Sequence, residues 1–323
     1  MTHSGFQQLG VRNLKETAFR QQKDRIAGCG MRALAVFAAA LVPVIAVALL
    51  LRAWPLLEIT PLDKLLTSSA WRPLKKEFGF LPFVLGSLSV TALAMLLAVP
   101  PCLLCAIYLA EYAPRGLRAA IKPLIDLLAG IPSVVYGLWG TLMVVPFIRD
   151  NLIPWSAKYV PNVPLFQTQN PTGYSILAGG IVLAAMVFPV IISTAEEVIH
   201  AVPGGLREAA LSLGATRWQA VKGAVLRRAL PGILASIILG FSRAFGETMA
   251  VMMVVGNVPQ LPRSIFDAGY PLSALIANNY GEMMSIPLYD AALLAAALIL
   301  LLIVLIFTII ARAILIRATR RAA

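Results

Sequence analysis

The chain has 323 residues, of which 59% are hydrophobic and only 13% are charged. Soluble domains carry about 25% charged residues, so most of the surface of a chain this apolar must face lipid. The net charge of +12 is compatible with nucleic-acid binding. Basic residues also mark the cytoplasmic side of membrane proteins, and we favour that interpretation.

The first apolar stretch begins after a long polar segment. Residues 1–32 are polar and basic, and the apolar run starts only at Ala33. A cleaved signal peptide would place its apolar stretch within roughly the first 15–30 residues. We therefore expect a first transmembrane helix at 33–51 that remains as an anchor, with residues 1–32 as a cytoplasmic tail.

Five further apolar stretches are long enough to cross a bilayer, which takes about 20 residues. Proline interrupts two of them, which is tolerated where neighbouring helices satisfy the freed backbone groups. The predicted fold is an all-α integral membrane protein with six transmembrane helices, a loop at 194–230 and a tail at 312–323. The five additional spans are expected at 83–110, 124–147, 173–193, 231–256 and 289–311.

The basic residues are distributed unevenly between the two sides that six spans define. Eighteen of the 27 Lys and Arg residues lie on the side of the two termini, eight lie on the other side, and Arg243 lies within a span. By the positive-inside rule, both termini and the 194–230 loop are cytoplasmic. The outer segments 148–172 and 257–288 are rich in Pro, Asn and aromatic residues, which suits either a docking partner or the membrane interface.

The sequence offers little for catalysis or metal binding. Cys102 and Cys105 have CxxC spacing but lie in an apolar run, and the only histidines are His3 and His200. We interpret the cysteines as small apolar residues and expect no metal or cofactor. A GxxxxGK[ST] loop is missing as well, so ATP hydrolysis by this chain is not expected.

The 194–230 loop contains signals for two short helices. REAALSLG predicts a helix that ends at Gly214, a normal C-terminal glycine, and Thr216 can cap the next helix. Ala209 and Ala210 give the first helix a face of small apolar side chains. Such a helix fits a groove on a partner or lies flat on the membrane, and the residues alone leave both open.

Three stretches resemble a known family. EAALSLGA at 208–215 resembles the EAA loop of bacterial ABC-importer permeases. LLAGIPSVVYGLWG at 127–140 and GFSRAFGETMAVMMVVGN at 240–257 resemble the permease pair of phosphate importers, and GETMAV points to the PstC-type member. The resemblance covers roughly 80–312. One departure is Arg227 after Leu226, where the family usually has proline; here the proline is Pro231.

The resemblance implies a type I ABC importer permease core at 83–311 in the bacterial inner membrane. It implies that Glu208, Ala209, Ala210 and Gly214 dock on an ATPase. The expected partners are an ATPase dimer, a second permease of the PstA type and an extracytoplasmic phosphate-binding protein, with no nucleic acid. The alternatives are a permease for another oxyanion (sulfate, molybdate or phosphonate), a stand-alone secondary transporter or channel, and a membrane enzyme.

Arg243 and Glu247 lie in the middle of the span predicted at 231–256. A charged residue at a helix centre costs about 2.5–3.5 kcal/mol on insertion scales. At i and i+4 the two share one helix face and can pair, either as a structural ion pair or along a substrate path. Because arginine suits phosphate, we expect Arg243 to bind phosphate in transit and Glu247 to hold Arg243 at rest. Gly240 and Gly246 leave room for close helix approach.

Other polar residues in the spans carry weaker expectations. Asp126 could cap the third span or pair with a loop arginine, and we favour such a structural role over a functional one. Four hydroxyl residues could donate hydrogen bonds along the path, although such side chains usually bond to the backbone or a neighbouring helix. They are Ser133, Tyr136, Ser242 and Thr248.

Overall fold

The computed structural model describes residues 3–167, 171–282 and 286–322. Residues 168–170 and 283–285, which belong to the two predicted outer segments, lie outside the described residues. The chain forms two units, 1–52 and 53–323. The first unit is helical, because α1 runs from His3 to Ile59.

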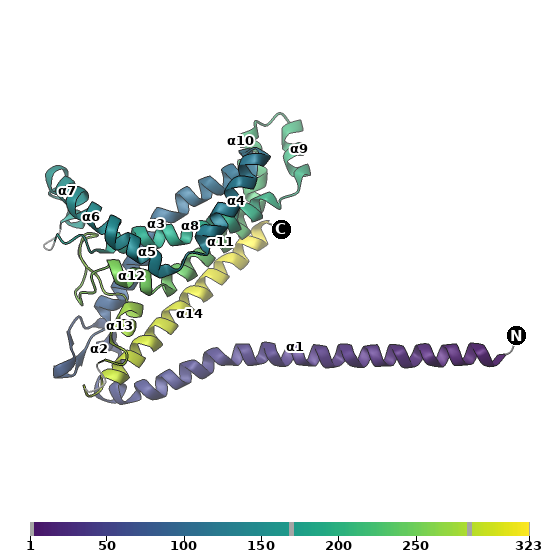
Figure 1. Cartoon of the computed structure of the whole chain (residues 1–323), viewed down its shortest axis with the longest axis horizontal. Helices are drawn as coiled ribbons and strands as arrows, with labels where there is room; N and C mark the ends of the chain where they lie inside the picture. Colours follow the sequence, from purple (N-terminus) through teal and green to yellow (C-terminus); the bar gives the residue numbers. More distant parts are fainter. Residues whose placement is uncertain (1–2, 168–170, 283–285, 323) are drawn as a thin grey trace. The chain divides into compact units, whose positions relative to one another are not determined.

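Helices dominate the second unit, with one small hairpin between α2 and α3 (Figure 1). Short π-helical turns follow α3 and interrupt several later helices, at Tyr108–Tyr112, Gly140–Val144, Ile148–Leu152 and Val221–Val225. The elements are α2 (Leu62–Thr67), β1 (Trp71–Arg72), β2 (Glu77–Phe78), α3 (Leu81–Ile107), α4 (Arg115–Ala129), α5 (Ser133–Trp139), α6 (Val145–Phe147), α7 (Ile153–Tyr159), α8 (Ile176–His200), α9 (Gly204–Ser212), α10 (Arg217–Ala220), α11 (Leu226–Gly246), α12 (Met249–Val254), α13 (Leu272–Asn279) and α14 (Tyr289–Ala322).

The long helices account for the predicted spans. Within the described residues, five helices are long and apolar enough to cross a membrane, or six if one bent pair is counted as a single span. The prediction of an all-α, multi-span membrane protein is confirmed. The exact membrane limits of each span stay a prediction, because a helix can extend beyond the bilayer.

Helix α8 lies at the centre of the second unit. It packs against α3 and α11, and 67% of the residues in its most apolar 18-residue stretch are buried. Small residues allow the close approach: a Cβ at Gly180 would lie 2.9 Å from the side chain of Leu93 on α3. Packing of this kind is typical of membrane helices, which have little hydrophobic driving force between them.

The predicted third span, 124–147, is not one straight helix. The helical segments Arg115–Ala129 and Ser133–Tyr159 meet at an angle of 92°. Pro132 accounts for the break, because it lacks an N–H donor and disfavours helical geometry at the preceding residue. The apolar run continues through the break, so hydropathy alone does not reveal it.

The predicted fifth span, 231–256, is also divided. A continuous helical segment runs from Arg217 through Pro231 to Gly246. Glu247 then has an extended backbone, with ψ of 131°, before α12 begins at Met249. Residues 201–216, between α8 and α10, contain only the short helix α9; this segment is shorter than the predicted loop 194–230 and is called the α9 loop below.

An aromatic cluster fixes the small hairpin to the helices. Trp71 pairs with Phe78 in the hairpin, and its ring centroid lies 4.8 Å from that of Phe83 on α3 and 6.0 Å from that of Tyr289 on α14. Ala53 and Leu56, from the last turns of α1, are fully buried in the same core. The hairpin turn around Leu74 projects away from this cluster, since Leu74 is 87% exposed.

Candidate functional site

Arg243 belongs to α11, and its side chain reaches the C-terminal end of another helix, α4. Its Nη2 is 3.5 Å from the carbonyl oxygen of Ala129, the last residue of α4. The last carbonyls of a helix carry a partial negative charge, so a cation there is favourable. The phenol of Tyr136, just beyond the Pro132 break, also lies within electrostatic reach of Arg243.

Glu247 lies two residues before the start of α12. Its Oε1 accepts hydrogen bonds from the backbone N–H of Thr248 at 3.1 Å and of Ala250 at 3.3 Å. These N–H groups have no partner within the helix, and an anion at a helix N-terminus is favourable. The carboxylate therefore caps α12.

The predicted pairing of Arg243 with Glu247 on one helix face is wrong. The i, i+4 geometry requires a continuous helix, but α11 ends at Gly246 and turns the backbone of Glu247 away. In the described ranges no ion pair joins the two residues; each interacts with a different helix end. The result is two helix breaks, at 130–132 and 247–248, that come together at Arg243.

The two glycines before Glu247 differ. A Cβ at Gly240 would lie 2.5 Å from Cγ1 of Ile191, so the expected close helix approach is confirmed there, and the approaching helix is α8. A Cβ at Gly246 would have no heavy atom of a neighbouring element within 4 Å. The space beside Gly246 is open, so the close approach expected there stays a prediction; Gly246 is the last residue of α11.

The other predicted polar residues mostly bond to the backbone. Tyr136 donates to the Leu128 carbonyl at 3.0 Å, and Ser242 donates to the Ile238 carbonyl at 2.9 Å. Thr248 donates to the Gly246 carbonyl at 3.5 Å. Asp126 is exposed in the last turn of α4, so it does not cap the start of that helix.

Two end motifs shape the α9 loop. Gly214 has φ of +81°, and the N–H groups of Gly214 and Ala215 bond to the carbonyls of Leu211 and Ala210. This is the pattern of a Schellman C-cap. Thr216 and Gln219 then form a reciprocal capping box at the start of α10. Both predicted helix-end residues, Gly214 and Thr216, are confirmed.

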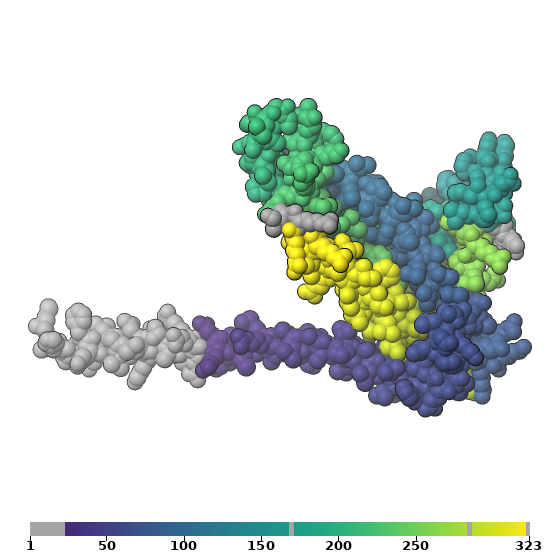
Figure 2. Space-filling model, turned by 180° about the vertical axis from the view of Figure 1, so that it is seen from behind, coloured from purple at the N-terminus to yellow at the C-terminus, as the bar shows by residue number. Residues whose placement is uncertain are grey.

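Several side chains of the α9 loop are exposed on the surface of this chain. Glu208 and Ala209 are exposed and Ala210 is half-buried, while Leu213 is 87% exposed. Figure 2 shows this part of the chain as a green lobe that projects from the second unit. An exposed leucine beside small alanines is a surface suited to a partner.

A buried ion pair under the α9 loop was not predicted from the sequence. Arg207 on α9 binds Glu111, in the π-helical turn after α3, with both N–H···O distances from Nε at 3.0 Å. The pair joins residues 96 positions apart. A single sequence carries no signal for such a contact beyond the apolar surroundings of Glu111.

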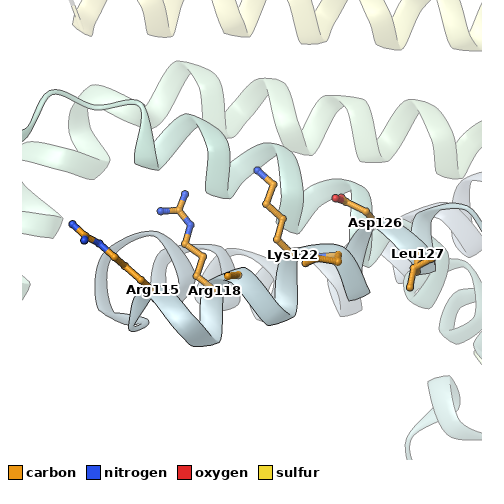
Figure 3. Close-up of a pocket in the computed structure, with 7 residues that line it drawn as sticks. Arg115, Arg118, Lys122, Asp126 and Leu127 are labelled. Atoms are coloured by element: carbon orange, nitrogen blue, oxygen red, sulfur yellow. The ribbon is translucent and has the colours of Figure 1, made fainter.

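A second charged cluster joins α4 to α8. Glu196 is 3% exposed and forms an ion pair with Arg118, although its Oε1 is outside hydrogen-bond geometry. Lys122 Nζ lies 3.1 Å from Glu197 Oε1 and 3.9 Å from Glu196 Oε2. An open groove of about 840 Å³ runs along this side of α4, lined in part by residues labelled in Figure 3: Arg115, Arg118, Lys122, Asp126 and Leu127. The neighbouring glutamates offset its basic charge.

Sequence comparisons identify the relatives of this chain. The family model described as "Binding-protein-dependent transport system inner membrane component" matches residues 102–320. A "Phosphate transport system permease protein PstC" from Xylella fastidiosa is 38% identical over 257 residues, which is 79% of either chain. A protein of the same name from Mesorhizobium japonicum is 34% identical and covers 96% of both chains.

Solved structures support the fold. The chain is similar to one in a bacterial ABC transporter that imports the polysaccharide alginate, with a TM-score of 0.53, 20% identity and coverage of 87% of this chain and 95% of that one. A chain of the MetNI methionine ABC transporter gives a TM-score of 0.51 at 19% identity, covering 72% and 93%. The family match, the identity to the relatives and the shared fold agree: this chain belongs to the family of inner-membrane components of binding-protein-dependent transport systems, which are permease subunits of ABC importers and not enzymes.

Proposed function

We propose that this chain is a permease subunit of an ATP-driven importer of inorganic phosphate. The observation that carries the proposal is Arg243, an exposed guanidinium where the helix breaks at 130–132 and 247–248 meet. The printed names of relatives that share 34–38% identity over most of the chain support phosphate as the substrate. In this proposal a second, PstA-type permease completes the path on the exposed side of Arg243.

The positions of Arg243 and Glu247 support separate roles for the two charges, in place of the expected pairing. Arg243 presents a planar fork of donors that suits a phosphate oxyanion. Among the residues that the structure describes, its hydrogen-bond contact is the 3.5 Å one to the Ala129 carbonyl, which leaves donors for an ion in transit. Glu247 repels phosphate and holds α12 by its N-terminus, so it fixes the shape of the break beside Arg243. The site should bind weakly, because transit requires release.

The α9 loop is the proposed docking site for the ATPase dimer. Glu208, Ala209, Ala210 and Gly214 lie on or beside α9, and Leu213 adds an exposed apolar side chain. An amphipathic helix of this kind fits a groove on a partner. The α9 end and both termini would then be cytoplasmic, and the opposite end, with α13 and the hairpin, would face the extracytoplasmic phosphate-binding protein.

Reconstitution tests this function directly. The permease pair, the ATPase and the binding protein are placed in liposomes, and ATP hydrolysis and uptake are measured with phosphate, sulfate or neither. We expect phosphate alone to stimulate both. Stimulation by sulfate alone would make the chain a permease for another oxyanion, and uptake without the ATPase would make it a secondary transporter.

A further inference from the structure

The Arg207–Glu111 ion pair connects two segments that the chain does not join directly. Arg207 belongs to α9, while Glu111 belongs to the turn that ends the first long helix of the second unit. Arg207 Nη2 also contacts Glu111 Oε1, and the Glu111 side chain is only 6% exposed. Removal of either partner would leave the other charge unpaired in a largely buried site, which is strongly unfavourable.

The same guanidinium also holds the end of α8. Nη1 of Arg207 donates to the Val202 carbonyl at 2.6 Å, and Nη2 donates to the Ile199 carbonyl at 3.2 Å. The hydrogen bonds to Glu111 raise the pKa of Arg207 further above its ordinary, strongly basic value. The guanidinium therefore stays charged at every physiological pH, so protons do not switch the contact.

The helix that directly follows the α9 loop contacts the same π-helical turn after α3. At the start of α10, Arg217 donates from Nη2 to the backbone carbonyl of Glu111, and its guanidinium carbon lies 4.7 Å from the ring centroid of Tyr112. An arginine over an aromatic face is attracted by the ring quadrupole. Arg207 in the α9 loop and Arg217 directly after it thus both bind Glu111, and Arg217 also contacts the next residue, Tyr112.

The opposite end of α3 is bonded to the region of the Glu247 break. Leu272 N–H donates to Ser87 Oγ at 2.9 Å, and the next residue, Ser273, donates from its hydroxyl to the Glu247 carbonyl at 3.2 Å. Helix α3 has 27 residues; at 1.5 Å per residue it spans roughly 40 Å. One helix therefore reaches from the α9 loop to the segment that adjoins Arg243.

We propose that the Arg207–Glu111 pair transmits movement of the α9 loop to α3, and that α3 carries it to the Glu247 break. The inference rests on the proposed function, in which an ATPase moves α9. Glu111 and Arg207 touch neither nucleotide nor substrate, so they are positioning residues. Along the chain, the α9 loop is joined directly to α8 and α10. The Arg207–Glu111 ion pair connects it to a further helix, α3.

The test measures uptake per ATP hydrolysed in the reconstituted complex. Glu111→Gln, Arg207→Gln and the double variant are compared with the wild type. We expect each single variant to hydrolyse ATP but to lose about tenfold in uptake per ATP, a size typical of coupling between sites. The double variant should be no worse than either single variant, because both remove the same connection.

The chain offers a closely matched control. Glu196 is also buried and paired with an arginine, with side-chain exposures of 4% and 24% for Glu196 and Arg118 against 6% and 23% for Glu111 and Arg207. Glu196→Gln removes a similar pair between α4 and α8, so it should lower thermal stability by a similar amount and leave uptake per ATP nearly unchanged. Circular dichroism of each purified complex monitors the stability.

The outcomes separate this inference from the proposed function. Unchanged uptake per ATP in Glu111→Gln, multiplying losses in the double variant, or an equal loss in Glu196→Gln would each overturn the coupling role. Uptake per ATP is measured with whichever oxyanion stimulates the wild type. If that oxyanion is not phosphate, the proposed substrate is wrong, but the comparison of the variants with the wild type still tests the coupling. A wild type that no oxyanion stimulates would overturn the proposed function and this inference with it.

Discussion

Arg243 lies in the last turn of α11 and Glu247 lies in the break that follows it, and each side chain complements a different helix terminus. The cation faces the last carbonyl of α4, and the anion caps the first N–H groups of α12. Both charges are thus placed where a helix dipole favours their sign. This lowers the free-energy cost of placing the two charges near apolar helices without joining them to each other.

This separation predicts different results for variants of the two residues. Arg243→Gln should reduce phosphate uptake by about tenfold or more, because hydrogen bonds to charged groups contribute ~1.5–3 kcal/mol. Glu247→Gln keeps an oxygen acceptor for the N–H groups of Thr248 and Ala250, so we expect it to cost less than about 1 kcal/mol of stability. Uptake into proteoliposomes and thermal unfolding of the complex measure the two effects. Normal uptake in Arg243→Gln, with assembly intact, would remove this residue from the proposed path.

The glycines before the break allow a test of packing within one motif. Gly240→Ala would place a methyl group 2.5 Å from Ile191 Cγ1, and overpacking of this kind costs about 1–3 kcal/mol. Gly246→Ala meets no heavy atom within 4 Å and should be nearly neutral. Thermal unfolding of the two purified variants gives the comparison. Equal midpoints would contradict the close contact between α8 and α11.

The sequence predicted local features better than distant ones. Long apolar runs indicated the spans, and Gly214 and Thr216 indicated helix ends, because both signals depend on neighbouring residues. The break at Glu247 was missed since only Gly246 marks it in an apolar run, whereas Pro132 offered a signal for the other break that hydropathy concealed. The Arg207–Glu111 pair depends on how α3 and α9 meet, which a single sequence does not encode locally.

Gly214 carries a prediction about the shape of the α9 loop. Its φ of +81° costs a residue with a Cβ about 1–2 kcal/mol, although no neighbouring atom would clash. Gly214→Ala should therefore speed amide hydrogen exchange across 204–216, and Gly214→Asn should do so less, because asparagine tolerates this conformation. Gly205→Ala is the control, since Gly205 has neither a positive φ nor a close neighbour. Equal exchange in all variants would show that the cap contributes little to the loop.

Leu213 tests whether the α9 loop is a docking surface. A leucine that is 87% exposed loses little on replacement by serine in the isolated permease, because little of its apolar surface is buried there. If it fills a pocket on the ATPase, the loss on binding should be about 1–2 kcal/mol or more, or at least fivefold in affinity. Leu74→Ser in the hairpin turn is the matched control, because Leu74 has the same exposure of 87% at the opposite end of the second unit. Titration of the ATPase into permease reconstituted in nanodiscs should show weaker binding for Leu213→Ser only. Equal affinities for both variants would place the ATPase contact elsewhere and leave the exposed leucine to the membrane surface.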